Sequence, residues 1–198
     1  FENHFEGLIK AVNLKAKKTK LFKNDKDNAE LNSAVGYFAK LGMYKNDFEN
    51  KLFESLTPKF LLRYAPGHMR SVEHEDFIKG TSSSRLDYNN LFNLSKINQI
   101  DVVENGLSAS IGFEYKKNKL GEKNNIENEI FTLSAGQVIS AEENLDIPSS
   151  SSLNQRFSDI VGNAKYNVSE NIDIKYNFSI DQNYRDFNYN EISTDVSF

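Results

Sequence analysis

Histidine and carboxylate side chains are the first place to look for chemistry in this sequence of 198 residues. His68 and His74 flank a stretch with Glu73, Glu75 and Asp76, so the stretch holds residue types that bind zinc. It lacks the helical HExxH order, and the chain contains no cysteine that could add a thiolate ligand. The third histidine stands alone near the start of the chain. We therefore expect no metal site and interpret the stretch as a solvated loop.

A pair of carboxylates, Asp101 and Glu104, has the residue types of a general acid and base. Such pairs are common on any polar face, however. The sequence has no GxSxG elbow, no P-loop and no GxGxxG motif, so nucleophilic catalysis, nucleotide hydrolysis and dinucleotide binding lack a sequence signal. The serine run 149–152 after Pro148 is typical of a loop. We expect no catalytic residues, no cofactor and no enzyme.

Composition excludes several further classes of protein. Hydrophobic residues make up 38% of the chain and no run approaches about 18 apolar residues, which excludes a helical membrane protein. The net charge of -4 argues against a nucleic-acid partner, because such partners favour a concentrated basic surface. The absence of cysteine excludes disulfides and is compatible with any compartment.

Strict alternation of apolar and polar residues is the strongest structural signal. In residues 107–115 the odd positions are apolar, and in residues 172–180 the even positions are. Because side chains of a strand point to opposite faces in turn, each segment has one apolar and one hydrophilic face. A strand that crosses a membrane needs roughly 9–11 residues, whereas soluble strands usually have about 5–6. The lengths favour strands with lipid on one side and water on the other.

The same alternation recurs along the chain and predicts about eight strands. They lie near residues 5–22, 29–45, 48–65, 99–117, 128–141, 157–168, 171–182 and 187–198. We predict an all-β protein whose antiparallel up-and-down strands form part of a large transmembrane β-barrel. The chain opens without a methionine and ends within an alternating segment. We therefore expect residues 1–198 to be a fragment of a single transmembrane β-barrel domain, truncated at both ends.

The predicted connections differ in length in a regular way. Residues 46–47 and 169–170 are short turns, whereas residues 66–98 and 142–156 are long loops. Bacterial barrels have short periplasmic turns and longer outer loops, so the two long loops are expected to face outside. The connection at 119–125 is longer than this rule predicts for its position.

Residues outside the alternation carry a family resemblance. In order along the chain they read LTPK at 56–59, LLRYAP at 61–66, RLDYNNLF at 85–92, DVVENG at 101–106, LSAGQV at 133–138, PSSSSL at 148–153 and SDIVG at 158–162. This series resembles the C-terminal outer-membrane barrel region of the LPS-assembly protein family LptD, also called OstA. Its form is most similar to that of alphaproteobacterial members.

The resemblance implies a membrane-embedded part of the translocon that assembles lipopolysaccharide into the outer leaflet of the cell outer membrane. The implied partners are lipopolysaccharide, an LptE-like lipoprotein that plugs the barrel, and an LptA-like periplasmic bridge that acts through an N-terminal domain missing from this chain. The barrel opens laterally between its first and last strands in this family, so a middle strip would be wall rather than gate.

Polar residues of two predicted strands are candidates for the transport route. Taking the hydrophilic face of 157–168 and 171–182 as the lumen side gives Asn163, Lys165, Asp173, Lys175 and Asn177. They would line the route of the sugars or contact the plug protein. The alternative, that they are simply hydrated lumen residues, stays open. The opposite face, with Ile160, Ile172, Ile174 and Phe178, would contact lipid.

Other classes of protein compete with this interpretation. A general porin or a receptor-type outer-membrane barrel would have a plug domain or nothing upstream in place of a periplasmic lipid-carrying domain. A barrel enzyme would need a Ser or His constellation, which the sequence does not show. A soluble β-rich adhesin would partition into the aqueous fraction.

Overall fold

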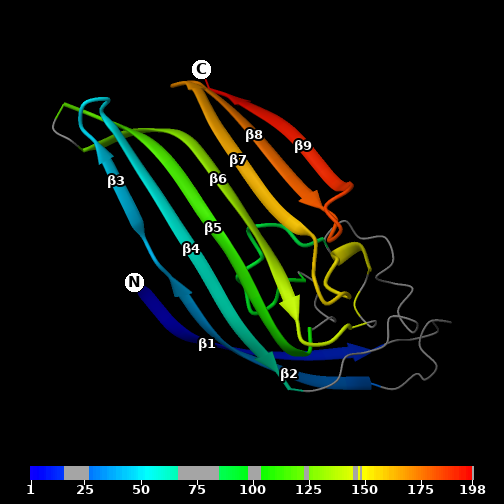
Figure 1. The fold of residues 1–198 in the computed structure, drawn as a ribbon. Coiled ribbons are helices and arrows are strands. Elements are labelled where there is room, and N and C mark those ends of the chain that lie inside the picture. The colour runs from blue at the N-terminus through cyan, green and yellow to red at the C-terminus, as the bar shows by residue number, and fades with distance from the viewer. Residues whose placement is uncertain are drawn as a thin grey trace.

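The structure, a computed structural model, describes most of the chain. The described residues are 1–15, 27–66, 85–97, 104–122, 125–144, 147 and 149–197, with the side chains of 12–15 and 27–30 excepted. They form one antiparallel sheet of nine strands (Figure 1). No helix in the described ranges is long and apolar enough to cross a membrane.

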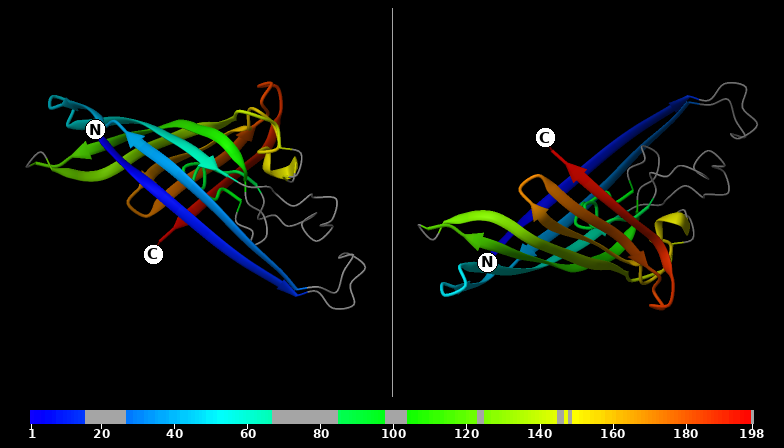
Figure 2. Two further views of the ribbon diagram at one scale, coloured as in Figure 1. Left: turned by 90° about the horizontal axis from the view of Figure 1, so that it is seen from below. Right: turned by 90° about the horizontal axis from the view of Figure 1, so that it is seen from above.

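The strands follow one another across the sheet in chain order. Their bounds are β1 Glu2–Lys15, β2 Asp27–Lys40, β3 Met43–Asp47, β4 Leu52–Ala65, β5 Gly106–Leu120, β6 Ile126–Ser140, β7 Ile160–Ser169, β8 Ile172–Ile180 and β9 Phe187–Val196. The order is β1-β2-β4-β5-β6-β7-β8-β9, and β3 pairs with β4. The predicted all-β, antiparallel, up-and-down architecture is confirmed. The sheet is curved and open, with β1 and β9 at its two edges (Figure 2).

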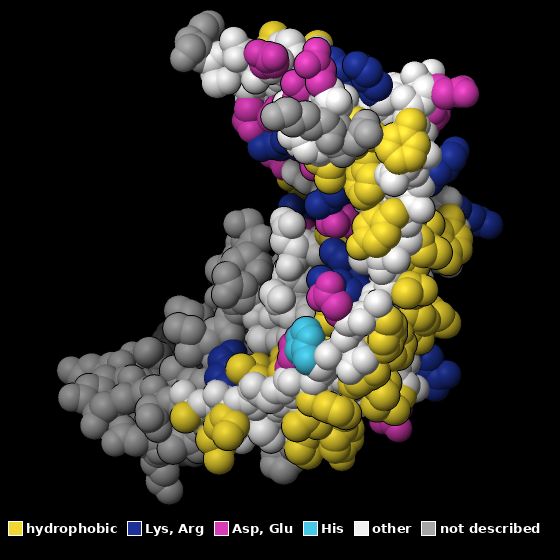
Figure 3. Space-filling model, turned by 90° about the vertical axis from the view of Figure 1, so that its left-hand side faces the viewer, with side chains coloured by type: hydrophobic (Ala, Val, Ile, Leu, Met, Phe, Trp, Pro, Cys, Tyr) yellow, Lys and Arg dark blue, Asp and Glu magenta, His cyan; other side chains and the backbone are white. Residues whose placement is uncertain are grey.

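The register between strands keeps the alternating faces aligned across the whole sheet. One row of directly paired residues lies on the concave side: Thr57, Glu114, Ser134, Asn163, Asn177 and Glu191. The next row lies on the convex side: Pro58, Phe113, Ala135, Gly162, Phe178 and Asn190. Since cross-strand neighbours share a face, the apolar side chains gather on the outer curve, as Figure 3 shows.

Large apolar side chains on the convex face are exposed to the surroundings. They include Phe5, Ile9, Val35, Phe60, Leu62, Ile111, Phe113, Ile174 and Ile192. An exposed apolar area of this extent is unusual for a monomeric soluble protein and marks a surface that contacts lipid or a partner. Ile160, Ile172, Ile174 and Phe178 lie on this face, as their pairing positions show. Their contact with lipid stays a prediction.

The predicted strand 29–45 is interrupted. It forms β2, which ends at Lys40, and β3, which begins at Met43, and both pair with β4. The amide of Leu41 donates to the carbonyl of Pro58 at 3.1 Å, so the backbone polar groups of Pro58 face the interruption. Proline has no N–H to return a hydrogen bond across the pair. The prediction of one continuous strand was wrong for this reason.

The short turns also differ from the predicted positions. Residues 48–51 form the turn after β3, where the carboxylate of Asp47 accepts hydrogen bonds from the backbone and side-chain nitrogens of Asn50 at 3.1 and 2.8 Å. Lys51 completes it with a left-handed φ of 52°. The turn predicted at 169–170 lies at 170–171. Both lie at the same end of the sheet as the 121–125 connection, opposite the longer connections (Figure 1).

Strand boundaries elsewhere are close to those predicted, with two exceptions at undescribed residues. The predicted strand 99–117 begins later, as β5 at Gly106, since residues 104 and 105 are not in the strand and 98–103 lie outside the described residues. The end of the predicted strand 5–22 lies outside them as well, since β1 is described to Lys15.

Part of the long 66–98 connection folds back into the concave side of the sheet. This segment, residues 85–97, is called the strap below. Its apolar side chains join two buried clusters with the sheet and with the connection between β6 and β7. One cluster contains Leu86, Tyr88, Leu91, Ile97, Val138, Ile147, Leu153 and Val161, and the other contains Ala34, Leu61, Ala65 and Leu94. The strap folds inward because its leucines and Ile97 gain burial against the sheet. That the long connections lie at the outer side of the membrane stays a prediction.

Polar contacts hold the connection between β6 and β7 over the same end of the sheet. The carboxylate of Asp159 accepts hydrogen bonds from the side chains of Ser179 at 2.7 Å and Asn188 at 2.8 Å. The hydroxyl of Ser158 accepts from the amide of Val138 at 2.9 Å. These bonds keep buried polar groups paired while the apolar side chains of this connection pack on the strap.

Two facing glycines make room for the strap. Gly112 of β5 pairs directly with Gly136 of β6. A Cβ added at Gly136 would overlap the Leu91 side chain and lie 2.7 Å from the carbonyl oxygen of Ile111. A Cβ at Gly112 would lie 3.1 Å from the ring of Phe92. The strap therefore packs against backbone where any larger residue would hold it away.

We predict that Gly136→Ala destabilises the protein by about 1–3 kcal/mol, the usual cost of overpacking. The clash with the Ile111 carbonyl involves backbone and cannot be relieved by a rotamer change. The measurement is the urea midpoint of the protein in detergent micelles. Gly7→Ala is the matched control, because nothing lies within 4 Å of its added Cβ. Equal midpoints for the two variants would contradict the packing described here.

Candidate functional site

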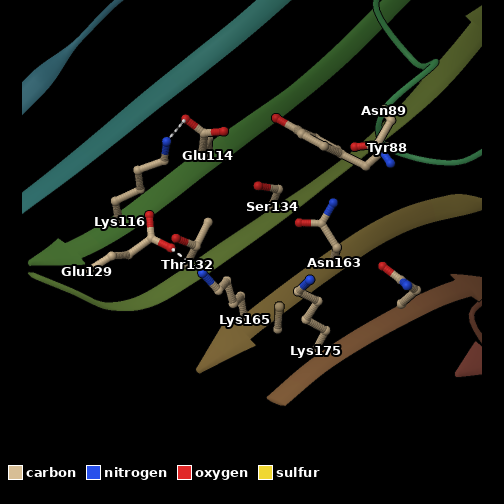
Figure 4. Close-up of a pocket in the computed structure, with 12 residues that line it drawn as sticks. Tyr88, Asn89, Glu114, Lys116, Glu129, Thr132, Ser134, Asn163, Lys165 and Lys175 are labelled. Carbon is tan, nitrogen blue, oxygen red and sulfur yellow. Dashed lines mark ion pairs between the residues drawn. The ribbon is translucent and has the colours of Figure 1, made fainter. Parts of the chain in front are cut away.

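A polar hollow on the concave face is the main candidate site (Figure 4). Its volume is about 470 Å³, and side chains from four adjacent strands and the strap line it. The lining residues are Tyr88, Asn89, Glu114, Lys116, Glu129, Thr132, Ser134, Asn163, Ala164, Lys165, Lys175 and Asn177. The alternation of β5 to β8 produces this surface, because every second residue of each strand points into it.

The lysines of the hollow are all paired with carboxylates. Lys116 lies 3.2 Å from Glu114, and Lys165 lies 3.6 Å from Glu129. Lys175 forms an ion pair and hydrogen bond with Asp195 of β9, outside the hollow. The surface therefore offers hydroxyls, amides and balanced charges instead of a concentrated cationic patch. Such groups suit contact with water, sugars or another polar surface.

The five residues predicted from the sequence come together on this face. Asn163, Lys165, Lys175 and Asn177 line the hollow, and Asp173 lies 3.3 Å from Lys165. The register explains the arrangement, since Asn163 pairs with Asn177, and Lys165 with Lys175. Two lysines directly opposite each other repel, and the neighbouring carboxylates offset that repulsion. That this face borders a barrel lumen stays a prediction.

The strap closes the loop end of the hollow with Tyr88, a residue for which no role was predicted from the sequence. Its hydroxyl donates to the carbonyl of Phe113 at 3.1 Å, and the ammonium of Lys59 lies 5.5 Å from its ring centroid. Burial, with a further contribution from Glu114, raises the pKa of Tyr88 to about 12. The phenol therefore stays a neutral hydrogen-bond donor at physiological pH.

A buried charged cluster fastens the other end of the strap. Arg63 of β4 donates from Nε to the carbonyl of Leu94 at 2.7 Å and from Nη2 to the carbonyl of Glu104 at 2.6 Å. The backbone amide of Lys96 donates to Oε1 of Glu104 at 2.8 Å, and its ammonium lies 3.5 Å from Oε2. Arg63 and Lys96 are each only 1% exposed. The Glu104 carboxylate thus pairs with Lys96, while its backbone carbonyl accepts from Arg63.

The strap also reaches the opposite edge of the sheet. The guanidinium of Arg85 stacks on the ring of Tyr189 in β9, with Cζ 3.2 Å from the ring centroid. The hydroxyl of Tyr189 in turn donates to the carboxylate of Glu191 at 2.6 Å. Long-range contacts of this kind carry no periodic signal in the sequence, so neither Arg63 nor Arg85 was predicted to have a role.

Most of the candidate acid–base and metal-binding residues lie outside the described part of the chain. Glu104 belongs to the charged cluster with Lys96, whereas Asp101 lies outside the described residues. The candidate metal ligands His68, Glu73, His74, Glu75 and Asp76 lie outside them as well. Among the positions that the structure does describe, no group of three His, Asp or Glu side chains could hold a metal ion.

An open, curved sheet of long up-and-down strands, apolar outside and polar inside, defines the class of transmembrane β-barrel walls. A family model described as LptD, LPS transport system D, matches residues 12–198. The chain therefore belongs to the LptD family. No curated protein matches it. The family consists of outer-membrane proteins that transport and assemble lipopolysaccharide and are not enzymes.

The charge count of the buried cluster predicts opposite effects for two substitutions. Glu104→Gln leaves two buried cations without a counter-charge and should destabilise the protein by about 3–5 kcal/mol. Lys96→Met leaves one cation and one carboxylate, so the urea midpoint in micelles should stay unchanged or rise. A larger loss for Lys96→Met than for Glu104→Gln would contradict this assignment.

The stability of the protein, measured by the same urea midpoint, should also depend on pH because of Lys96. Burial lowers the pKa of Lys96 below its ordinary value of 10.5, against the opposing effect of Glu104. The unfolded chain therefore binds this proton more tightly than the folded chain does, so stability should rise as the pH is raised towards 10.5. Lys96→Met should lose this part of the pH dependence.

Proposed function

We propose that this chain is part of the wall of the outer-membrane translocon that assembles lipopolysaccharide into the outer leaflet, in a protein of the alphaproteobacterial type. Membership of the LptD family supports the transport role. The observation that carries the proposal is the contrast between the polar hollow on the concave face and the exposed apolar side chains on the convex face. The translocated lipid needs both environments at once.

The amphiphile carries sugars and phosphates that require a hydrated route, while its acyl chains remain in an apolar phase. Hydroxyl and amide groups of Thr132, Asn163 and Asn177 would exchange hydrogen bonds with sugar hydroxyls along the hollow. Thr132 lines the hollow, and its hydroxyl has no hydrogen-bond partner among the described residues. Lys165 and Lys175 keep their carboxylate partners nearby, so no charge is left unpaired as a sugar passes.

The proposal includes two protein partners. An LptE-like lipoprotein would plug the barrel and contact the concave face, and an LptA-like bridge would deliver lipid through an N-terminal domain outside this sequence. The balanced charges of Lys165, Asp173 and Lys175 suit either a polar protein surface or a sugar. The strap already fills the loop end of the concave face, so the plug would occupy the remaining end.

Photo-crosslinking at neighbouring positions of β8 tests the route. A photoreactive residue in place of Lys175, on the concave side, should form adducts with newly made lipopolysaccharide in cells. The same residue in place of Ile174, on the convex side, should capture phospholipid. Ile174 is a matched control because it lies on the same strand close to the short turn. Adducts with lipopolysaccharide at 174 and none at 175 would reverse the assigned faces.

A general porin or receptor-type barrel is the second candidate, since paired charges and amides also occur in a water-filled lumen. Affinity purification of the full-length parent from outer membranes separates the two. A small lipoprotein recovered in stoichiometric amount by mass spectrometry is the expected result for the translocon. A barrel recovered alone would favour the porin or receptor.

A further inference from the structure

Several buried hydrogen-bond donors around Arg63 have no hydrogen-bond partner among the described residues. They are Nη1 of Arg63 and the hydroxyls of Ser108 and Ser110, while Nζ of Lys96 has only its ion pair with Glu104, at 3.5 Å. Ser108 is the direct cross-strand partner of Arg63, and Ser110 is the next residue of β5 on the same face. Unpaired buried donors are rare in folded proteins, because each one forfeits the hydrogen bonds that it makes in water. Arg63 and Ser108 face each other on neighbouring strands, so a single acceptor between them would serve both.

The charge of the cluster indicates what kind of acceptor is missing. Within the described part of the chain, Arg63 and Lys96 are buried with one carboxylate nearby, that of Glu104, so with both groups protonated the described residues carry one more positive than negative charge here. The positive charge of Arg63 contributes to lowering the pKa of Lys96, which agrees with the two cations lying close together. A water molecule would satisfy a donor but would not balance the charge. The complement is therefore an anion with several acceptor oxygens.

We propose that Arg63, Lys96 and Ser108 form a binding site for one phosphate group beneath the strap. A phosphate group offers several strong acceptor oxygens, and guanidinium, ammonium and hydroxyl groups are the side chains that bind it. Nε and Nη2 of Arg63 already hold the carbonyls of Leu94 and Glu104, and Nη1 remains for the ligand. The anion thus adds to the contacts of the strap and does not replace them.

The position of the site connects it to the concave face. Arg63 lies near the end of β4 on the concave side, opposite Ser108, and bonds to the strap at Leu94. The phosphate belongs either to a phosphorylated glycolipid or to free inorganic phosphate. The first source rests on the proposed function, whereas the site itself does not.

Binding to the purified full-length protein with its outer-membrane partners, in detergent, tests the site. The probe is inorganic phosphate at constant ionic strength, with chloride as the reference anion, and the readouts are ³¹P line broadening and the apparent unfolding temperature. Phosphate should raise that temperature in the wild type. Lys96→Met should weaken phosphate binding by at least about tenfold, as expected for loss of a charge-assisted hydrogen bond.

Two further variants keep the result interpretable. Lys117→Met is the matched control, since Lys117 also lies near a carboxylate, at 3.9 Å from Glu54, but on the convex side of β5. It should bind phosphate as the wild type does. Ser108→Ala changes no charge and should weaken binding even if Lys96→Met fails to fold. Binding in Lys96→Met and Ser108→Ala equal to the wild type, or no phosphate effect in the wild type, would overturn the site.

The source of the phosphate is decided by a second ligand pair. Lipid A with its phosphates should compete with inorganic phosphate, and dephosphorylated lipid A should not. Equal competition by both lipids would overturn the glycolipid as the source. Delivery of lipopolysaccharide is measured separately on the same proteins, so a protein that binds phosphate but delivers no lipid would overturn the proposed function and leave the site standing.

Discussion

The two-residue period of a pleated strand is the constraint on which this structure depends. Because the register between neighbouring strands preserves that period, a row such as Glu114, Ser134, Asn163 and Asn177 lies on one side of every strand that it crosses. A slip of one residue in any pair would place polar groups on the apolar face. The curvature of the sheet then turns the two faces into an outside and an inside.

The concave face is divided into two environments. Near the loop end, the strap and the connection between β6 and β7 bury leucines, isoleucines and valines against the sheet. Beyond Tyr88 the surface is polar, and its charges are paired. The glycines at 112 and 136 mark the region where the strap approaches the backbone most closely.

The alternation of apolar and polar residues predicted the strands and their faces. Contacts between residues that are distant in the sequence leave no such pattern and were not predicted. Asn163 and Asn177 share a face because their strands alternate, and that is visible in the sequence. The break after Lys40 depends on Pro58 of the next strand, and the role of Arg63 depends on carbonyls 31 and 41 residues away. The strap shows no two-residue alternation of apolar and polar residues, so it was predicted as part of a long outer loop. Its inward path follows from apolar burial that only the folded sheet provides.

The strap has a mechanical consequence for the shape of the wall. It is attached to β4 through Arg63 and to β9 through the stacking of Arg85 on Tyr189, so it runs as a chord across the arc between these strands. A chord of fixed length sets the radius of the arc. Flattening or widening of this part of the wall must first detach one end of the chord. The curvature of the sheet is therefore coupled to two contacts between residues that lie far apart in the sequence.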